Sequence, residues 1–350
     1  MAHTPDHPAG LNEAQLAELA SVLEVHYGLR GARFTQLGGE LDLNYRVTDH
    51  TGAHRFLRAS PAPLDRSAIE WQDAVLRALE QRPLSVASPR LLPARSGEPG
   101  VHVTLGGAWA GLIRVTTWIG GRDVSEFGAT GTAYRRQLGS LAAEVVDRLA
   151  VLNDRAAGSP GHHWLIERAG DAIRATVPAV TDPVQRALIE RALAGFDAIA
   201  HVLPALPRTT VHQDLHDFNL LGERGADDAL RITGVVDFND AVFTLRVAEL
   251  AVAAAYATLR QDDPAAAFCD VVGGYLERAA LTEAELDVVF PLAVARLAVN
   301  ASTWTERSVG ENASYARARM AATWPALERL LEESAPRMAE RVAAPATPAG

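Results

Sequence analysis

The amino-acid sequence predicts an α+β fold in two lobes, a small β-rich N-terminal lobe over residues 1–117 and a larger helical lobe over residues 118–345. Short β-branched and apolar runs, separated by turns that contain Gly and Pro, dominate the first third of the chain. Apolar residues at helical spacing dominate the remainder. The dipeptide Gly120-Gly121 separates these two patterns and marks the expected hinge.

The composition limits the class of protein. The chain has 350 residues, 48% of them hydrophobic, which is enough to bury a sizeable core. A formal net charge of −10 without a long basic run speaks against nucleic acid as a partner. The one cysteine, Cys269, has apolar neighbours that indicate a buried, unreactive thiol. The N-terminus has no signal-peptide pattern and no apolar run reaches the roughly 18 residues of a membrane span, so we expect a soluble, cytoplasmic protein.

The N-terminal lobe begins with an expected helix and a hairpin. An apolar stripe predicts the helix over Leu11–Tyr27, with Asn12 as its capping residue. Residues 34–47 read as strand, turn and strand, with the turn at Gly38 and Gly39. A Gly-rich hairpin of this kind brings backbone N–H groups close to phosphates. We therefore predict that the Gly-Gly turn covers nucleotide phosphates, although many such pairs are ordinary hairpin turns.

A third strand over residues 54–60 carries Arg58, and a helix over residues 67–81 carries Glu70 near its start. A cation on a strand and an acid on the next helix form the pair that holds nucleotide phosphates in protein-kinase-like folds. The usual cation is lysine, but this sequence contains no lysine. Arg58 as a solvated side chain, with Glu70 favoured by the helix dipole, is the simpler interpretation and stays open.

Three further strands are expected before the hinge, over residues 88–93, 101–105 and 112–118. In a kinase with two lobes, the backbone at the hinge receives the nucleotide base. The candidates for this contact are Thr117, Trp118 and Ile119.

The C-terminal lobe is expected to be mainly helical. Apolar stripes predict helices over residues 132–154, 183–202, 245–259, 265–279, 283–303 and 315–334. His162 and His163 lie in a loop without further ligand residues nearby, so we interpret them as surface or packing residues. The Ala/Pro-rich segment after Pro336 is expected to be loose.

The stretch from Val211 to Asp240, VHQDLHDFNLLGERGADDALRITGVVDFND, has the most informative pattern. Asn219 follows Asp214 by five positions, and an apolar strand ends at Asp237. The turn between them brings Asn219 and Asp237 to the same end of neighbouring strands. An acid that faces an acceptor hydroxyl, with an amide and a second acid that hold Mg²⁺ on ATP or GTP, is the set that a phosphotransferase needs. We predict Asp214 as the catalytic residue and the other two as metal ligands.

Two other interpretations stay open. His212, Asp214 and His216 form an HxDxH pattern that can ligate a metal in a hydrolase, although further ligands are missing from suitable places. A non-catalytic, kinase-shaped nucleotide-binding module is the other. The complete acid–amide–acid set argues against that module, and the arginine in place of lysine argues for it. We expect His212 to hold the loop in place through a hydrogen bond.

VHQDLHDFNLL, followed by ITGVVDFNDAVFTLRVAELAVAAAYA, resembles the aminoglycoside phosphotransferase superfamily, whose members have a protein-kinase-like fold. Within it, the sequence is most similar to hydroxylysine kinases and to kinase domains fused to class III aminotransferases. In that group a His-x-Asp-x-x-x-x-Asn loop precedes an Ile-Asp-Phe-Gly-Asp stretch and a helix rich in Glu, Leu and Ala. Further agreement lies in LGGELDLNYRV, in FLRAS with IEWQ, and in GENASYARA.

The resemblance implies a catalytic acid/base at Asp214 and the same two Mg²⁺ ligands, with Arg58 and Glu70 on the phosphates of ATP or GTP. This sequence departs from the family at Arg58, where lysine is usual, and at Asn239, where Gly is frequent. Arginine is always charged and presents a wider fork, so phosphate binding should survive while turnover could suffer.

Polar and aromatic residues of the helical lobe are the candidates for acceptor binding. Acids suit an ammonium group and an arginine suits a carboxylate, which favours a small amine or amino acid; an aminoglycoside, homoserine or a choline-type acceptor is the alternative. Glu249 lies inside an apolar helix and needs a partner. It supports the catalytic loop or holds the substrate amine, or else it pairs with Arg246 or Arg296. The candidates are Asp240, Glu249, Asn300, Trp304, Glu306, Arg307, Glu311 and Asn312.

Overall fold

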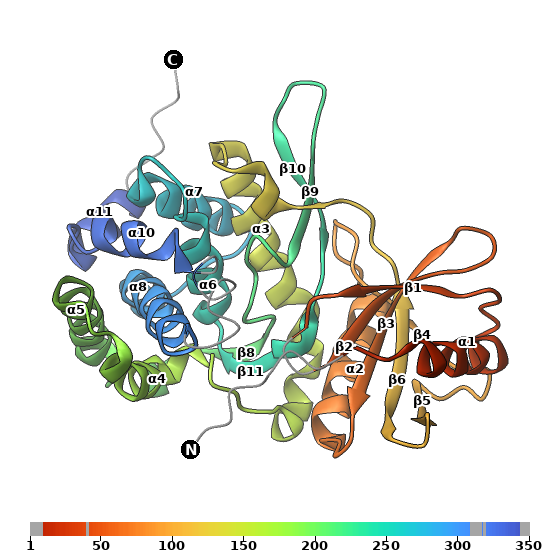
Figure 1. Ribbon diagram of the computed structural model, residues 1–350. Helices are drawn as coiled ribbons and strands as arrows, with labels where there is room; N and C mark the ends of the chain where they lie inside the picture. The colour runs from red at the N-terminus through yellow and green to blue at the C-terminus, as the bar shows by residue number, and fades with distance from the viewer. Residues whose placement is uncertain (1–9, 40–41, 309–316, 318–319, 344–350) are drawn as a thin grey trace. The chain divides into compact units, whose positions relative to one another are not determined.

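The computed structural model describes residues 10–39, 42–308, 317 and 320–343 (Figure 1). The chain forms two compact units, one from Met1–Gln81 with Ser88–Gly120 and the other from Arg82–Ala87 with Gly121–Gly350. An antiparallel sheet organises the first unit, and helices make up most of the second. The predicted α+β class, with a β-rich N-terminal part and a helical C-terminal part, is confirmed.

The sheet of the first unit has the strand order β1-β2-β3-β6-β4, and β5 also pairs with β6. All of these pairs are antiparallel. The predicted hairpin and third strand are confirmed, but the strand expected over residues 88–93 shrinks to two residues. The strands are β1 (Arg33–Leu37), β2 (Leu43–Thr48), β3 (His54–Pro61), β4 (Leu91–Leu92), β5 (Gly100–Leu105) and β6 (Trp109–Thr117).

Helices α1 (Glu13–Tyr27) and α2 (Arg66–Gln81) pack on this sheet. Leu19 and Leu23 of α1 join Leu57 of β3 in an apolar core. Side chains alternate between the two faces of a strand, so Arg58 faces the opposite side from Leu57. Helix α2 lies on that opposite side, where an ion pair between Arg114 and Asp73 joins it to β6. The predicted Asn12 cap of α1 is confirmed, and it forms a reciprocal capping box with Gln15.

The second unit contains two small sheets and a set of packed helices (Figure 1). One sheet has the order β10-β9-β7, and the other pairs β11 with β8. The strands are β7 (Arg122–Asp123), β8 (Arg208–Val211), β9 (Leu220–Arg224), β10 (Leu230–Val235) and β11 (Val242–Leu245). The helices are α3 (Thr132–Leu149), α4 (Ala169–Thr176), α5 (Pro183–Ile199), α6 (Val247–Ala257), α7 (Pro264–Leu276), α8 (Glu283–Glu306), α10 (Thr323–Leu330) and α11 (Ala335–Ala343).

The core of the second unit lies around α6 and α8. Every residue of α6 is buried, as its continuous apolar sequence predicts. Helix α8 is long and apolar enough to span a membrane, but 89% of its most apolar window is buried inside the unit, as in the core helix of a globular protein. The hairpin of β9 and β10 stands beside α3 in Figure 1, and Gln137 of α3 binds the backbone of Ile232 in β10.

The segment Arg82–Ala87 precedes β4 in the chain but belongs to the second unit. Ala87 donates its N–H to the carbonyl of Thr233 and accepts the N–H of Val235, so it extends the β10 edge. Ser85 donates both its N–H and its hydroxyl to the carboxylate of Glu144 on α3. These contacts are non-local, which is why no local pattern in the sequence marks this segment.

Two expectations about the C-terminal segments were wrong in detail. The residues after Pro336 were expected to be loose, but Ala335–Ala343 forms helix α11 because Met338 inserts fully into the core. The helix expected over residues 315–334 is shorter, and α10 begins at Thr323. Much of the segment before α10, including Glu311 and Asn312, lies outside the described residues.

Helices α3 and α7 pack closely because glycines face the partner backbone. A Cβ atom added to Gly139 on α3 would lie 1.9 Å from the carbonyl oxygen of Val271, and one added to Gly274 on α7 would lie 2.0 Å from that of Arg136. Backbone atoms cannot give way as a flexible side chain does, so these positions require glycine.

We predict that Gly139→Ala lowers the free energy of unfolding by about 1–3 kcal/mol, because the added methyl group forces the two helices apart. The matched control is Gly195→Ala on α5, where nothing lies within 4 Å of the added Cβ. That change should raise stability by up to about 1 kcal/mol through helix propensity. Urea unfolding of both variants measures the effect, and equal stability of the two would contradict the packing argument.

Candidate active site

The loop from His212 to Asn219 joins β8 to β9 and carries the predicted catalytic residue. Strand β8 is paired along its length with β11, Val211 with Val242, which fixes where the loop begins. The loop then turns tightly, because the N–H of His216 bonds to the carbonyl of Asp214 at 2.9 Å and the N–H of Asn219 to that of His216 at 2.9 Å. The loop is therefore a defined structure with its polar side chains held in place.

The carboxylate of Asp214 is held by three donors. Oδ2 accepts from Nδ2 of Asn219 at 2.8 Å and from Nε2 of His216 at 3.1 Å. Oδ1 accepts from Nη2 of Arg296 at 2.8 Å. Burial by itself would raise the pKa of Asp214, but the imidazole of His216 and the guanidinium of Arg296 outweigh burial and hold that pKa well below its ordinary value. Asp214 is thus an ionised carboxylate with a fixed orientation.

Asn219 and Asp237 lie at the same end of neighbouring strands. Leu220 pairs with Val235 in the β9–β10 hairpin, and the N–H of Val236 then bonds to the carbonyl of Asn219 at 2.9 Å. Asp237 comes next, with a φ of 60°, and its exposed side chain accepts from Nδ2 of Asn239 at 2.5 Å. The hairpin therefore places the backbones of Asn219 and Asp237 at adjacent strand ends.

The two loop histidines are engaged by hydrogen bonds. His212 accepts the N–H of Asp214 at Nδ1 and donates from Nε2 to the carbonyl of Val236. His216 accepts the N–H of Phe218 at Nδ1 and therefore donates from Nε2 to Asp214. Full burial lowers the pKa of His212, which keeps it neutral. As expected, His212 holds the loop in place.

This hydrogen bonding leaves little support for the hydrolase interpretation. A metal-bound imidazole offers one nitrogen to the ion, yet both nitrogens of each loop histidine bond to protein groups. Within the described part of the chain, no group of three His, Cys, Asp or Glu residues is arranged to hold a metal ion. The HxDxH pattern is explained by loop structure instead.

Glu249 of α6 supports the loop by accepting hydrogen bonds from the loop backbone. Its Oε2 accepts the N–H of His212 at 2.6 Å and that of Gln213 at 3.1 Å, while Oε1 has no hydrogen-bond partner among the described residues. The side chain is fully buried, and burial raises the pKa of Glu249 to about 7. Direct contact with an acceptor, the substrate role predicted for Glu249, is incompatible with this burial.

The expected salt bridge of Glu249 with Arg246 or Arg296 was also wrong. Arg246 binds Glu285 at the start of α8 through two hydrogen bonds, and Arg296 binds Asp214. Both arginines therefore pair with carboxylates other than that of Glu249. Support of the catalytic loop is the interpretation that the contacts favour.

In the first unit, Gly38 and Gly39 lie in the turn between β1 and β2. Asn44 donates from Nδ2 to the carbonyl of Gly38 at 2.9 Å and braces this turn. A Cβ atom on Gly39 would lie 2.4 Å from the carbonyl oxygen of Asp42, so the turn requires glycine there. Residues 40–41 of the same turn are not described.

The ion pair expected between Arg58 and Glu70 is replaced by other contacts. Arg58 lies 3.5 Å from the carboxylate of Asp42, and Glu70 is exposed. The strand-to-helix pair is formed instead by Arg114 of β6 and Asp73 of α2, at 3.2 Å with both side chains buried. Arg114 is the cross-strand neighbour of Arg58, so the pair forms one strand away from the expected position.

The predicted hinge residues lie at the end of β6, with Thr117 as its last residue and Trp118 and Ile119 just after it. The N–H of Thr117 bonds to the carbonyl of Arg90, and its hydroxyl accepts the N–H of Arg90. The ring of Trp118 lies near His54 and under the guanidinium of Arg46, and Ile119 is half-buried. The backbone N–H and the hydroxyl of Thr117 are thus both used within its own sheet.

A cluster of aromatic and basic side chains lies near Asp214. The indole of Trp164 stacks near that of Trp304, with ring centroids 6.4 Å apart, and the guanidinium of Arg307 lies over both rings. His162 bonds to the carbonyl of Asp240. Three of the eight predicted acceptor candidates, Asp240, Trp304 and Arg307, therefore belong to this region, which the sequence did not link to Trp164.

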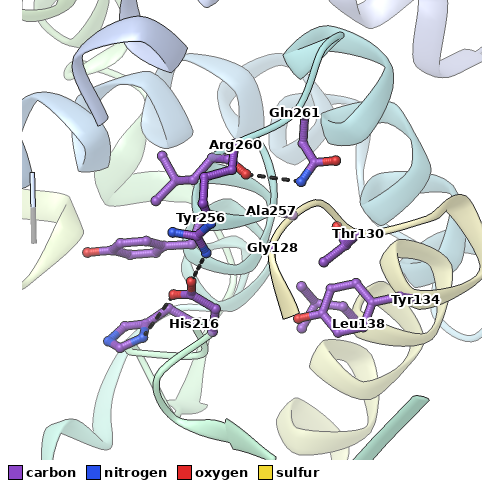
Figure 2. A pocket seen from close by; sticks show the side chains of 11 residues that line it. Gly128, Thr130, Tyr134, Leu138, His216, Tyr256, Ala257, Arg260 and Gln261 are labelled. Atoms are coloured by element: carbon purple, nitrogen blue, oxygen red, sulfur yellow. Dashed lines mark hydrogen bonds and ion pairs between the residues drawn. The ribbon is translucent and has the colours of Figure 1, made fainter. Parts of the chain in front are cut away.

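A small pocket borders the loop at His216 and Asp217 (Figure 2). Figure 2 shows Tyr256 and Arg260 beside His216, with Thr130 and Tyr134 across the pocket. Arg260 forms an ion pair with Asp217, and the ring of Tyr256 packs on that of His216 with centroids 4.9 Å apart. These contacts hold the imidazole that donates to Asp214.

Comparison with known proteins places this site in a family. The family model described as a phosphotransferase enzyme family matches residues 33–284, which is well over half of the chain. The chain belongs to this family. The resemblance recognised in the sequence is thereby confirmed.

Relatives of this phosphotransferase family member agree with that assignment. A hydroxylysine kinase of Xenopus laevis is 26% identical over 168 residues, which span 45% of this chain and 44% of the relative, less than half of its length. A microcompartment-associated aminopropanol kinase has a TM-score of 0.66 at 19% identity, over 92% of this chain and 99% of that one. The amicoumacin kinase hAmiN, in complex with AMP-PNP, Ca²⁺ and amicoumacin, has a TM-score of 0.65 at 18% identity, over 91% and 93%. At these identities the structures establish a shared fold.

Sequence reasoning about this phosphotransferase missed the roles of Arg296 and Tyr256. Arg296 interrupts the apolar run LAVARLAVN of α8, and a buried arginine requires a partner. That signal was present, but it did not identify which carboxylate the arginine meets.

We predict that Glu249→Gln changes how the stability of this phosphotransferase depends on pH. A carboxyl whose pKa is raised from 4.5 to about 7 stabilises the fold below pH 4.5 and loses that contribution as pH rises toward 7. The wild type should therefore lose about 3 kcal/mol relative to the variant between pH 4.5 and pH 8. Urea unfolding across this range measures the difference.

The control is Glu285→Gln, which removes another buried carboxylate of the same unit. Arg246 holds the pKa of Glu285 below its ordinary value, so its contribution is already complete above pH 4.5. Between pH 4.5 and pH 8, the difference in free energy of unfolding between wild type and Glu285→Gln should stay constant. The corresponding difference for Glu249→Gln should change with pH. A flat difference for both variants would contradict a raised pKa of Glu249.

Proposed function

We propose that this protein is a small-molecule kinase that transfers the γ-phosphoryl group of ATP or GTP to a hydroxyl of a small amine or amino acid. The observation that carries the proposal is the carboxylate of Asp214, ionised and bonded directly to Asn219, with Asp237 at the neighbouring strand end. A phosphotransferase needs an acid for the acceptor hydroxyl beside oxygen ligands for the metal ion.

Asp214 is proposed to orient the acceptor hydroxyl. The hydroxyl oxygen attacks the γ-phosphorus, the bond from that phosphorus to the β,γ-bridging oxygen breaks, and the hydroxyl proton passes to Asp214 or through it to solvent. A carboxylate with a strongly lowered pKa is a weak base, so alignment of the nucleophile is its larger contribution. This suits phosphoryl transfer, in which the nucleophile gains little charge before the transition state.

Asn219 and Asp237 are proposed to hold Mg²⁺. Nδ2 of Asn219 donates to both the carbonyl and Oδ2 of Asp214, which turns the amide oxygen away from Asp214 as a ligand for a hard cation. The carboxylate of Asp237 is exposed and supplies the charged ligand. The donor set therefore fits Mg²⁺, which when bound would neutralise charge on the phosphate oxygens.

Residues 1–117 are proposed to bind the nucleotide, and residues 118–345 to carry catalysis and acceptor binding. In the first unit the Gly38-Gly39 turn, Arg58 and the Trp118-Ile119 segment are the proposed contacts. Glu70 is exposed and Arg58 lies 3.5 Å from the carboxylate of Asp42, so the predicted role of Glu70 as the partner of Arg58 passes to Asp42. The bound AMP-PNP of the amicoumacin kinase supports a nucleotide-dependent reaction.

The proposed acceptor is a hydroxylated amine or amino acid. Hydroxylysine kinase and aminopropanol kinase are both named for acceptors in which an amine accompanies the hydroxyl. The Trp164, Trp304 and Arg307 cluster supplies aromatic faces and a cation near Asp214. Aromatic faces suit an ammonium group and the cation suits a carboxylate. We also propose a cytoplasmic location, where the nucleotide co-substrate is available.

We predict that Asp214→Asn lowers kcat by at least about 100-fold, because an amide nitrogen or a neutral oxygen replaces the ionised acceptor of the hydroxyl proton. Consumption of MgATP or MgGTP is measured with 5-hydroxylysine, 1-amino-2-propanol, ethanolamine and kanamycin, and product is identified by mass. Asp228→Asn is the matched control, since Asp228 lies exposed in the β9–β10 turn with a φ of 59° that Asn tolerates.

Wild-type turnover in a folded Asp214→Asn variant would exclude this catalytic role. Binding of nucleotide without phosphorylated product, across the whole acceptor panel and both nucleotides, would favour the non-catalytic module instead.

A separate prediction concerns the metal. In Asp237→Asn, we expect ATP binding to lose most of its dependence on Mg²⁺, because the charged ligand is gone. Calorimetric titration of ATP with and without Mg²⁺ measures this in wild type, Asp237→Asn and the Asp228→Asn control. If Mg²⁺ strengthens ATP binding equally in all three proteins, Asp237 is not a metal ligand.

A further inference from the structure

Arg296 of α8 joins Asp214 to two other parts of the second unit. Nη2 donates to Oδ1 of Asp214 at 2.8 Å, and Nη1 donates to the carbonyl of Trp164 at 3.0 Å. The guanidinium carbon lies 5.0 Å from the ring centroid of Trp164 and 5.5 Å from that of Tyr256. The residue is only 2% exposed. Two hydrogen bonds and two neighbouring aromatic rings therefore hold the guanidinium in place.

This arrangement determines the orientation of the Asp214 carboxylate. The guanidinium is a rigid plane, so its bond to the Trp164 carbonyl sets where Nη2 lies and hence where Oδ1 lies. On the other oxygen, Asn219 and His216 hold Oδ2. Each carboxylate oxygen accepts two hydrogen bonds, so Oδ1 keeps capacity for an acceptor hydroxyl after Arg296 has bound.

Stability by itself is a poor explanation for a cation at this position. Burial of a guanidinium is costly, and a well-packed apolar residue often serves a core as well as a buried ion pair does. In addition, Nε of Arg296 is buried without a hydrogen-bond partner among the described residues. The arginine therefore carries a cost that a purely structural side chain in α8 would avoid.

We propose that Arg296 is the positioning residue of the phosphoryl transfer, which aims Oδ1 of Asp214 at the acceptor hydroxyl without itself binding the acceptor. This inference rests on the proposed function, because it assigns Arg296 a role through Asp214. It predicts a specific kinetic pattern, since a loss of alignment slows the chemical step while the binding of both substrates is retained.

The test compares Arg296→Gln, Arg296→Lys and a matched control, Arg246→Gln. The control also breaks an arginine–carboxylate pair of α8, that with the fully buried Glu285, but touches neither Asp214 nor Trp164. For each protein, MgATP consumption is measured with 5-hydroxylysine and with water alone as the acceptor. Thermal unfolding and the Kd for MgATP show whether each variant is folded.

For Arg296→Gln we expect kcat to fall about 100-fold while KM for both substrates stays near the wild-type value, because a misplacement of about 1 Å is enough for such a loss. Arg296→Lys should recover part of kcat. Its ammonium can still reach Oδ1 of Asp214, but it cannot bind that oxygen and the carbonyl of Trp164 in the fixed geometry of a guanidinium. Arg246→Gln should unfold at a lower temperature than wild type and keep wild-type kcat.

Two results would overturn the inference: wild-type kcat in folded Arg296→Gln, or a raised KM for 5-hydroxylysine with kcat retained, which would make Arg296 an acceptor-binding residue. Should Arg296→Gln not fold, Arg296→Lys decides, and wild-type kcat in that variant counts against the inference. Asp214→Asn separates the two levels of the argument. Full activity in that variant refutes the proposed function, whereas an inactive Asp214→Asn with fully active Arg296 variants refutes only the role of Arg296.

Discussion

The structure of the candidate site depends on a buried carboxylate that binds backbone. Oε2 of Glu249 accepts the N–H groups of His212 and Gln213, at the point where β8 ends and the loop begins. Gln213 has a φ of 69°, a conformation that a non-glycine residue adopts only when its surroundings enforce it. The two hydrogen bonds from α6 supply that enforcement, and the direction of Asp214 follows from it.

Around this anchor, the charges of the loop are balanced by groups from distant parts of the chain. Asp214 meets Arg296 from α8, and Asp217 meets Arg260 from beyond the end of α6. His216 and His212 bridge different parts of the loop, and each uses both ring nitrogens. A polar network in a dry interior has to satisfy nearly all of its members, since each unpaired group is costly there. This requirement explains why the loop is so densely bonded.

The first unit solves a related problem with different residues. Protein-kinase-like folds use a pair between a strand cation and a helix acid, and a chain without lysine must build it from arginine. Here Arg114 and Asp73 form the buried pair, while Arg58, one strand away, lies near Asp42 in the glycine turn. The planar guanidinium of Arg114 also reaches Gln72, which fixes α2 against β6 at two neighbouring positions.

The sequence by itself determined the fold class, the hairpin that joins Asn219 to Asp237, and the family, because these follow from local periodicity, turn residues and one dense motif. Only the tertiary structure decided the partners of buried charges. Glu249, Arg246 and Arg296 could pair in several ways on sequence grounds, and the pairing was settled by which helix faces meet. Long-range contacts of this kind leave no local signal, since the partners are separated by tens of residues and are matched by packing alone.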